Sequence, residues 1–223
     1  MSDDFTYDAD KHLYTIRGRA VPGITTVLDG TGFYPDKQYY TVACRQRGTA
    51  VHQAVFFVDE YAKDAVTLDD VLDVINLDER LQPYISGHLL WKQETGFTPV
   101  RHEFPVCSRK LKIACKPDLY GRSRNENRMV ELKTWADPPA KCPRSAQIQT
   151  AAQSLMTKEC LGLDTDSRWV LLLTGESNRP YRMYPCEDPN DYQMVTHLAA
   201  VWWEKLNSGI IKWKGETEVE VAE

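Results

Sequence analysis

The sequence lacks any apolar run that approaches the roughly 20 residues needed to span a bilayer. It also lacks the basic-then-apolar opening of a secretory signal, because Met1 is followed by the polar and acidic residues Ser2, Asp3 and Asp4. Both absences predict a chain that stays in the compartment where it is made and has no membrane partner.

Zinc-ribbon and thioredoxin spacings are missing as well, because no two cysteines stand two residues apart. We therefore predict free thiols or small core residues at all six positions. No Gly-rich loop with Gly-Lys-Thr is present, which excludes an ATP-driven motor of that type. The six cysteines are Cys44, Cys107, Cys115, Cys142, Cys160 and Cys186.

The chain as a whole also has no excess of basic residues, because its formal net charge is −5. The charge is unevenly distributed, however. Residues 101–144 contain eleven Lys or Arg against five Asp or Glu, a local excess of +6 that leaves −11 for the remainder. A basic centre within an acidic protein can hold phosphates locally without general adhesion to polyanions, although a solvated surface would have the same composition.

The 223 residues, 42% hydrophobic and 26% charged, suit one globular domain with a helical elaboration. We divide this single domain, 1–223, into four parts. An N-terminal hairpin segment covers 1–35, a helical part 36–96, a core 97–175, and a C-terminal strand and helix 176–223.

Hydrophobic periodicity predicts the elements of the first half. Residues 5–8 and 13–18 alternate like a β-hairpin, and 24–28 suits a short helix that ends at Gly30. Helices are then predicted over about 36–62, over the acidic amphipathic stretch 64–80, and over about 78–95.

The period changes to that of strands in the second half. Strands are predicted at 100–106, 110–121 and 128–134, with a polar turn at 122–128 and a bend or edge at Pro117. A helix over 144–162 then leads to a buried strand at 169–173, which pairs across a turn with 181–184, and a last helix spans 189–207. This order predicts an α/β fold with a central mixed β-sheet flanked by helices.

Two short segments carry the chemistry: Lys116-Pro117-Asp118 and Glu131-Leu132-Lys133. Residues two apart in a strand share a face, so Glu131 and Lys133 project together while Leu132 packs into the core. If the strand ending at Asp118 pairs with the strand that carries Glu131, a hairpin brings the two carboxylates together. Two carboxylates together suit Mg²⁺ or Mn²⁺, and the Leu132 carbonyl can add a ligand. Such a site hydrolyses phosphodiesters by activating water beside a lysine.

In this order Asp118, Glu131 and Lys133, with Pro117, resemble the motif of the PD-(D/E)XK nuclease superfamily. Gly48-Thr49-Ala50-Val51-His52 resembles the helical motif of its RecB-like and phage-exonuclease branch, which implies that His52 is a metal ligand. Gln149 with Thr150-Ala151-Ala152 resembles the helix after the catalytic strand, where a glutamine supports the site or contacts DNA. The segments at 12–14 and 21–28 resemble the start of phage-type members, so the likeness covers roughly residues 12–155. It implies a restriction-endonuclease-like core. The iron–sulfur members of this branch carry a cysteine cluster near the carboxyl end, and Cys142, Cys160 and Cys186 lack that clustering, so we expect no iron–sulfur cluster.

The glutamine helix departs from the pattern. The position four residues after Gln149, where the family often has Tyr, holds Gln153, and this makes Gln147 a rival for Gln149. Outside the motif, Glu103 is either a further ligand or an ordinary surface carboxylate.

Arg45, Arg47, Lys116 and Gln149 are the candidate DNA contacts, although solvated charge is the default reading of the arginines.

The resemblance implies a Mg²⁺- or Mn²⁺-dependent DNA exonuclease that acts in recombination, repair or phage DNA processing. The implied location is the cytoplasm of a bacterium or a phage-infected host. Relatives also imply a homo-oligomer and a recombination or single-strand-annealing protein as partners. A structure-specific or restriction-type endonuclease on the same core, and a nucleic-acid-binding module that does not cut, remain alternatives.

Overall fold

A computed structural model describes residues 4–34, 41–135, 139–176 and 178–215. Its centre is a five-stranded sheet of order β10-β9-β8-β7-β4. Neighbouring strands are antiparallel except β8 and β9, which run parallel because helix α5 (Arg144–Leu161) crosses between them. The mixed, helix-flanked sheet predicted from the sequence is therefore present. The strands are β4 (Phe97–His102), β7 (Leu119–Ser123), β8 (Glu126–Thr134), β9 (Ser167–Leu173) and β10 (Tyr181–Pro185).

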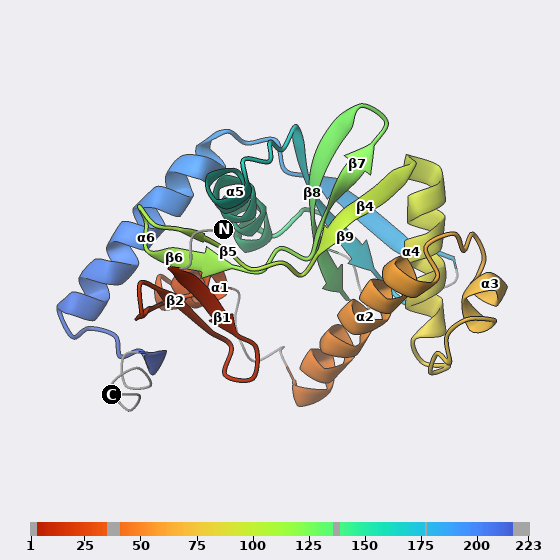
Figure 1. Cartoon of the computed structure of the whole chain (residues 1–223), viewed down its shortest axis with the longest axis horizontal. Helices are drawn as coiled ribbons and strands as arrows, with labels where there is room; N and C mark the ends of the chain where they lie inside the picture. The colour runs from red at the N-terminus through yellow and green to blue at the C-terminus, as the bar shows by residue number, and fades with distance from the viewer. Residues whose placement is uncertain (1–3, 35–40, 136–138, 177, 216–223) are drawn as a thin grey trace.

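Helices cover both faces of this sheet (Figure 1). α2 (Val42–Tyr61) and α4 (Gln82–Thr95) pack on one face, against alternate residues such as Leu132 and Leu171. α5 packs on the other, against Leu172 through Ala146. Because side chains alternate along a strand, Glu131 and Lys133 point to the α5 side while Leu132 is buried beneath α2, as predicted.

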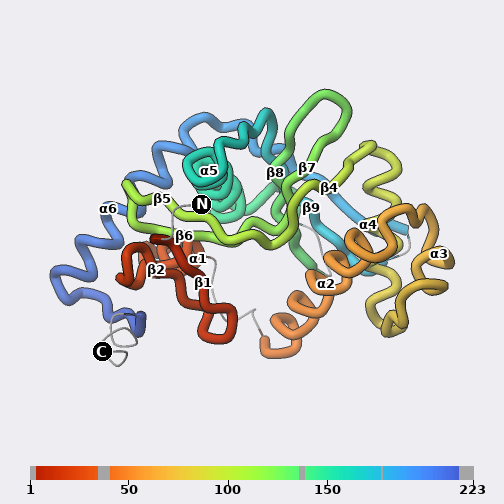
Figure 2. The backbone as a smooth tube through the Cα atoms, in the orientation of Figure 1, coloured from red at the N-terminus to blue at the C-terminus, as the bar shows by residue number. Residues whose placement is uncertain are grey.

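A second apolar core lies beyond α5. There α5 packs with α1 (Ile24–Gly30), α6 (Asn190–Asn207) and the two-stranded sheet of β5 (Val106–Ser108) and β6 (Ile113–Cys115). Figure 2 shows the chain leaving the central sheet after β4, forming β5 and β6 on the α5 side, and returning into β7. Near β6 lies a three-stranded sheet of β1 (Phe5–Asp8), β2 (Leu13–Ile16) and β3 (Arg19–Val21).

Most predicted elements are confirmed, among them the hairpin β1–β2, helix α1, the β9–β10 pair and α6. The hairpin gains a third strand, β3, which pairs with β2 and which the sequence analysis did not predict. The helix predicted from residue 36 begins at Val42, with Thr41 capping Cys44, and 35–40 lie outside the described residues.

The helix predicted over 64–80 is wrong. Only α3 (Leu68–Leu72) forms there, started by a capping box between Thr67 and Asp70. The next helix, predicted from about 78, begins at Gln82 because Pro83 fits only the first turn.

Two predicted strands are each divided. Residues 100–106 form the end of β4 and the start of β5, and residues 110–121 form β6 and the first part of β7. Pro105 and Pro117 mark the breaks, because proline cannot donate a hydrogen bond to a strand ladder. The polar turn predicted at 122–128 is much shorter, since β7 and β8 pair as far as Ser123 and Glu126. Asp118 therefore lies immediately before the first residue of β7 rather than inside a strand.

None of the helices in the described part of the chain combines the length and apolar character of a membrane crossing.

A buried charge cluster fastens α2 to its neighbours. The Asp59 carboxylate of α2 accepts hydrogen bonds from His88 Nε2 (3.0 Å) and Lys92 Nζ (2.6 Å) of α4. His102 Nε2 of β4 lies 3.6 Å from the same carboxylate. Burial alone would raise the pKa of Asp59, but His88 and then Lys92 lower it to about 2.

This cluster predicts a loss of stability in acid. A carboxyl whose pKa is lower in the folded than in the unfolded state stabilises the fold fully above about pH 4, and its contribution disappears as the pH falls toward 2. The shift corresponds to about 2 kcal/mol. We expect the free energy of unfolding, measured in urea between pH 5 and pH 2, to fall by about that much more in the wild type than in Asp59→Asn. Asp73→Asn, at an exposed position, should behave as the wild type, and equal acid sensitivity in all three proteins would contradict the prediction.

Candidate metal and active site

Asp118 lies against the strand that carries the other two motif residues. The β7–β8 register pairs Leu119 with Val130, which brings Asp118 to the level of Glu131. The Asp118 carboxylate accepts a hydrogen bond from the Leu132 backbone N–H, at 2.8 Å. The hairpin therefore brings Asp118 beside Glu131, as the motif spacing predicts.

Glu131 and Lys133 form a buried ion pair on the α5 side of β8. Lys133 Nζ lies 2.5 Å from Glu131 Oε1 and 3.4 Å from Gln149 Oε1. Gln153, one turn further along α5, donates from Nε2 to Glu131 Oε2 at 2.5 Å. Two glutamines of one helix therefore hold the two charged ends of the pair.

The pKa shifts of Glu131, Asp118 and Lys133 show that the two carboxylates of this site would be stabilised by more positive charge. Burial raises the pKa of Glu131, and the neighbouring Asp118 carboxylate raises it further. Burial opposes the charged form of Asp118 too, but His52 and then Lys133 lower the pKa of Asp118. For Lys133 the order is similar: burial acts against the ammonium, yet Glu131 and other neighbours raise its pKa well above the usual range. Lys133 is therefore charged at neutral pH and suited to holding an anion rather than removing a proton.

The His52 side chain reaches from α2 to the same point. Its Nε2 lies 3.1 Å from the Leu132 carbonyl oxygen, which can only accept, so Nε2 carries the proton. Burial lowers the pKa of His52, but the Asp118 carboxylate raises it above its usual value, so a cation would replace the Nδ1 proton that faces Asp118. Nδ1 lies 3.4 Å from Asp118 Oδ1 and 3.9 Å from Glu103 Oε1. A backbone carbonyl that fixes the tautomer in this way is typical of histidines that bind metals.

Glu103 approaches the site because the chain turns sharply after β4. Its backbone has φ of 43°, in the left-handed region that is costly for a residue with a side chain. The Glu103 N–H donates to the Asp118 carbonyl at 3.1 Å, which ties the two acidic residues together. Lys116 Nζ lies 2.7 Å from Glu103 Oε2. Strained backbone held by such contacts is common at functional sites.

His52, Glu103 and Asp118 form a group that could hold a metal ion. One ligand atom from each residue lies within 4.8 Å of the other two. Among the described residues, no other group of three or more His, Cys, Asp or Glu residues comes as close together. Two carboxylates and an imidazole suit Mn²⁺ and Mg²⁺. Glu131 is not one of the three, and its two oxygens accept from Lys133 and Gln153. The Leu132 carbonyl accepts one hydrogen bond, from His52, and keeps a second lone pair that could bind a metal. The roles of Leu132 and Glu131 as metal ligands therefore stay predictions.

The four candidate DNA contacts occupy different settings. Arg45 is exposed on the first turns of α2, whereas Arg47 is half-buried, with its guanidinium 3.8 Å from Cys44 Sγ. Lys116 is half-exposed beside Glu103, and Gln149 is nearly buried against Lys133.

Gln147, the rival of Gln149, lies away from the site. It donates to the Cys142 carbonyl and accepts from Arg144.

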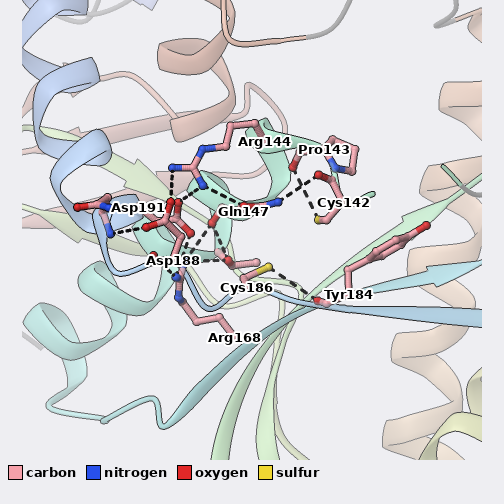
Figure 3. Close-up of polar contacts among 11 residues, drawn as sticks. Cys142, Pro143, Arg144, Gln147, Arg168, Tyr184, Cys186, Asp188 and Asp191 are labelled. Carbon is pink, nitrogen blue, oxygen red and sulfur yellow. Dashed lines mark hydrogen bonds and ion pairs between the residues drawn. The ribbon is translucent and has the colours of Figure 1, made fainter. Parts of the chain in front are cut away.

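An ion-pair network anchors the start of α5, the helix that carries Gln149 and Gln153; Figure 3 shows this network. Asp191 of α6 is fully buried between Arg144 of α5, at 2.5 Å, and Arg168 of β9, at 3.0 Å. Arg168 also donates to the Gln147 carbonyl within α5. The helix is therefore held by charge as well as by apolar packing.

Sequence reasoning missed the role of Gln153, which it treated only as a departure from a family pattern. A signal was available, because residues four apart on a helix share a face and Gln149 was already a candidate. It also missed Tyr34, which lines a hollow with Lys133, Trp135 and Gln149. No local pattern distinguishes that tyrosine from a core aromatic.

Comparison with known proteins adds little to this geometry. No family model and no curated protein matches the chain. Among solved structures, the crystal structure of SSO0001 is similar over 71% of this chain and 74% of that chain, with 14% sequence identity and a TM-score of 0.38. A likeness at that level carries no argument about function.

Proposed function

We propose that the chain is a divalent-metal-dependent DNA exonuclease of the PD-(D/E)XK kind, with a restriction-endonuclease-like core of the RecB-like and phage type. The observation that carries the proposal is the convergence of the motif residues. Asp118 is hydrogen-bonded to the backbone of the strand that bears Glu131 and Lys133, and His52 Nδ1 faces the same carboxylate. A chance Pro-Asp or Glu-x-Lys match would not be expected to bring these side chains together.

His52, Asp118 and Glu103 are the residues that would hold the ion, with Glu131 beside them. A bound Mg²⁺ or Mn²⁺ supplies a hydroxide-like water near neutral pH and neutralises charge on the phosphate. The chain itself supplies the rest. The Lys133 ammonium orients the attacking water and the phosphate oxygen, while Gln149 and Gln153 keep Lys133 and Glu131 in position.

The proposal is tested with linear duplex DNA labelled separately at each end, alongside a closed circular control. With Mg²⁺ or Mn²⁺ we expect label to be released progressively from an end while the circle stays intact. EDTA should stop the reaction, and added Mn²⁺ should restore it. Nicking of the circle would instead indicate the endonuclease alternative on the same core. Binding without any cleavage, or cleavage that resists EDTA, would contradict the proposal.

A further inference from the structure

Two cysteines outside the metal site meet at the far end of α5. Cys160 is in the last turn of α5, and Cys107 is the middle residue of β5. Their sulfur atoms are 3.7 Å apart. The Cys160 sulfur also touches the Cys107 backbone, donating to its carbonyl at 3.0 Å and accepting from its N–H at 3.2 Å. A disulfide has a sulfur–sulfur distance of about 2.05 Å, so less than about 2 Å of approach separates this pair from a covalent bond.

The two thiols differ in exposure and in the direction of their pKa shifts. Cys107 is completely buried, and its hydrogen bond to Cys160, together with burial, raises the pKa of its thiol. Cys160 is half-exposed, and hydrogen bonds from Cys107 together with the Arg109 guanidinium lower its pKa. Arg109 is held in place by Asp4, at 2.7 Å. The acidic group nearest in sequence, Glu159, accepts from the Arg109 backbone N–H.

An accessible, thiolate-favouring cysteine beside a buried partner is the arrangement of redox-sensing thiol pairs. We propose that Cys160 and Cys107 form a redox modification site, in which Cys160 reacts with hydrogen peroxide and Cys107 then closes an intramolecular disulfide. This site is separate from the proposed metal centre. The disulfide would join α5, which carries Gln149 and Gln153, to the strand that follows Glu103.

The chemistry balances with peroxide as the oxidant. The Cys160 thiolate attacks one peroxide oxygen, the O–O bond breaks, and hydroxide leaves and is protonated to water. Cys160 is then a sulfenic acid. Cys107 loses its proton and attacks the Cys160 sulfur, so the S–S bond forms, the S–O bond breaks, and a second water leaves. Two thiols have lost two electrons, and peroxide has been reduced to two waters.

A second thiol pair in the molecule provides an internal comparison. Cys142 and Cys186 lie in one apolar cluster (Figure 3), but their thiols are directed to the carbonyls of Pro143 and Tyr184, at 3.7 and 3.8 Å. The two thiols shift each other's pKa, but the backbone carbonyls that they contact belong to Pro143 and Tyr184 and not to each other. The geometry therefore favours the Cys107–Cys160 bridge.

The test treats the fully reduced, folded chain with one equivalent of hydrogen peroxide and blocks the remaining thiols with N-ethylmaleimide. Mass spectrometry of the unreduced digest should show Cys107 and Cys160 peptides joined and two hydrogens lighter, and dithiothreitol should reverse the link. Cys160→Ser should lose the link. Cys107→Ser should leave a sulfenic acid on Cys160 that dimedone traps.

Cys44→Ser and Cys142→Ser serve as matched controls and should form the link as the wild type does. If peroxide oxidises other thiols of the wild-type chain without joining Cys107 to Cys160, the proposal is wrong. Because the readout is a peptide mass on the wild type, it depends neither on DNA cleavage nor on how well a variant folds.

Discussion

Asp118→Asn is expected to reduce metal-dependent DNA cleavage by roughly a thousandfold. The asparagine oxygen can still accept the Leu132 N–H, so the hairpin keeps its shape. The change removes the negative charge that faces His52 Nδ1 and that a divalent ion needs. Initial rates on end-labelled duplex DNA measure the effect, and a thermal melt shows that the variant is folded.

The matched control for this variant is Glu126→Gln. Glu126 is on the same hairpin, at the far end of β8, where it is half-exposed and paired with Arg128. Its neutralisation should leave cleavage within about twofold of the wild type. Full activity in Asp118→Asn, or an equal loss in both variants, would remove Asp118 from the site.

Lys133→Met should lower cleavage by about a hundredfold to a thousandfold while leaving DNA and Mn²⁺ binding largely intact. Methionine keeps much of the apolar stem but lacks the ammonium, which lies 2.5 Å from Glu131 and 3.4 Å from Gln149. The raised pKa of Lys133 means that the wild-type side chain is charged throughout the neutral range, so the variant removes a permanent charge.

Single-turnover rates separate this chemical effect from binding, which fluorescence anisotropy of labelled DNA measures. Lys158→Met, at an exposed lysine of α5 paired with Asp164, is the control and should cleave normally. If Lys133→Met cleaves at the wild-type rate, or if it loses DNA binding as completely as cleavage, the role assigned to Lys133 is wrong.

The parts of the fold that could be predicted depend on local physics. Alternation along β8 and β9 marks the strands, and the apolar face of 144–162 marks the crossover helix that makes the two strands parallel. The same alternation predicts that Glu131 and Lys133 share a face. These features depend on neighbours within a few residues, which is why sequence alone reveals them.

The parts that could not be predicted depend on contacts between distant segments. Acidic residues alternating with apolar ones at 64–80 suit a long helix, but tertiary packing leaves only α3. Glu103 joins the site through a left-handed backbone turn and a hydrogen bond to the Asp118 carbonyl. Gln153 reaches Glu131 only because α5 lies across β8 at one particular height. The spacing of residues within a single segment does not predict that Glu103 approaches Asp118 or that Gln153 contacts Glu131.

The central claim is that His52 and Asp118 hold a divalent cation together. Crystals soaked in Mn²⁺ and measured at the manganese absorption edge test it most directly, because the anomalous signal locates the ion without reference to activity. We expect one strong peak within about 2.0–2.6 Å of both His52 Nδ1 and the Asp118 carboxylate. A peak bound elsewhere, with none between these two side chains, would contradict the account.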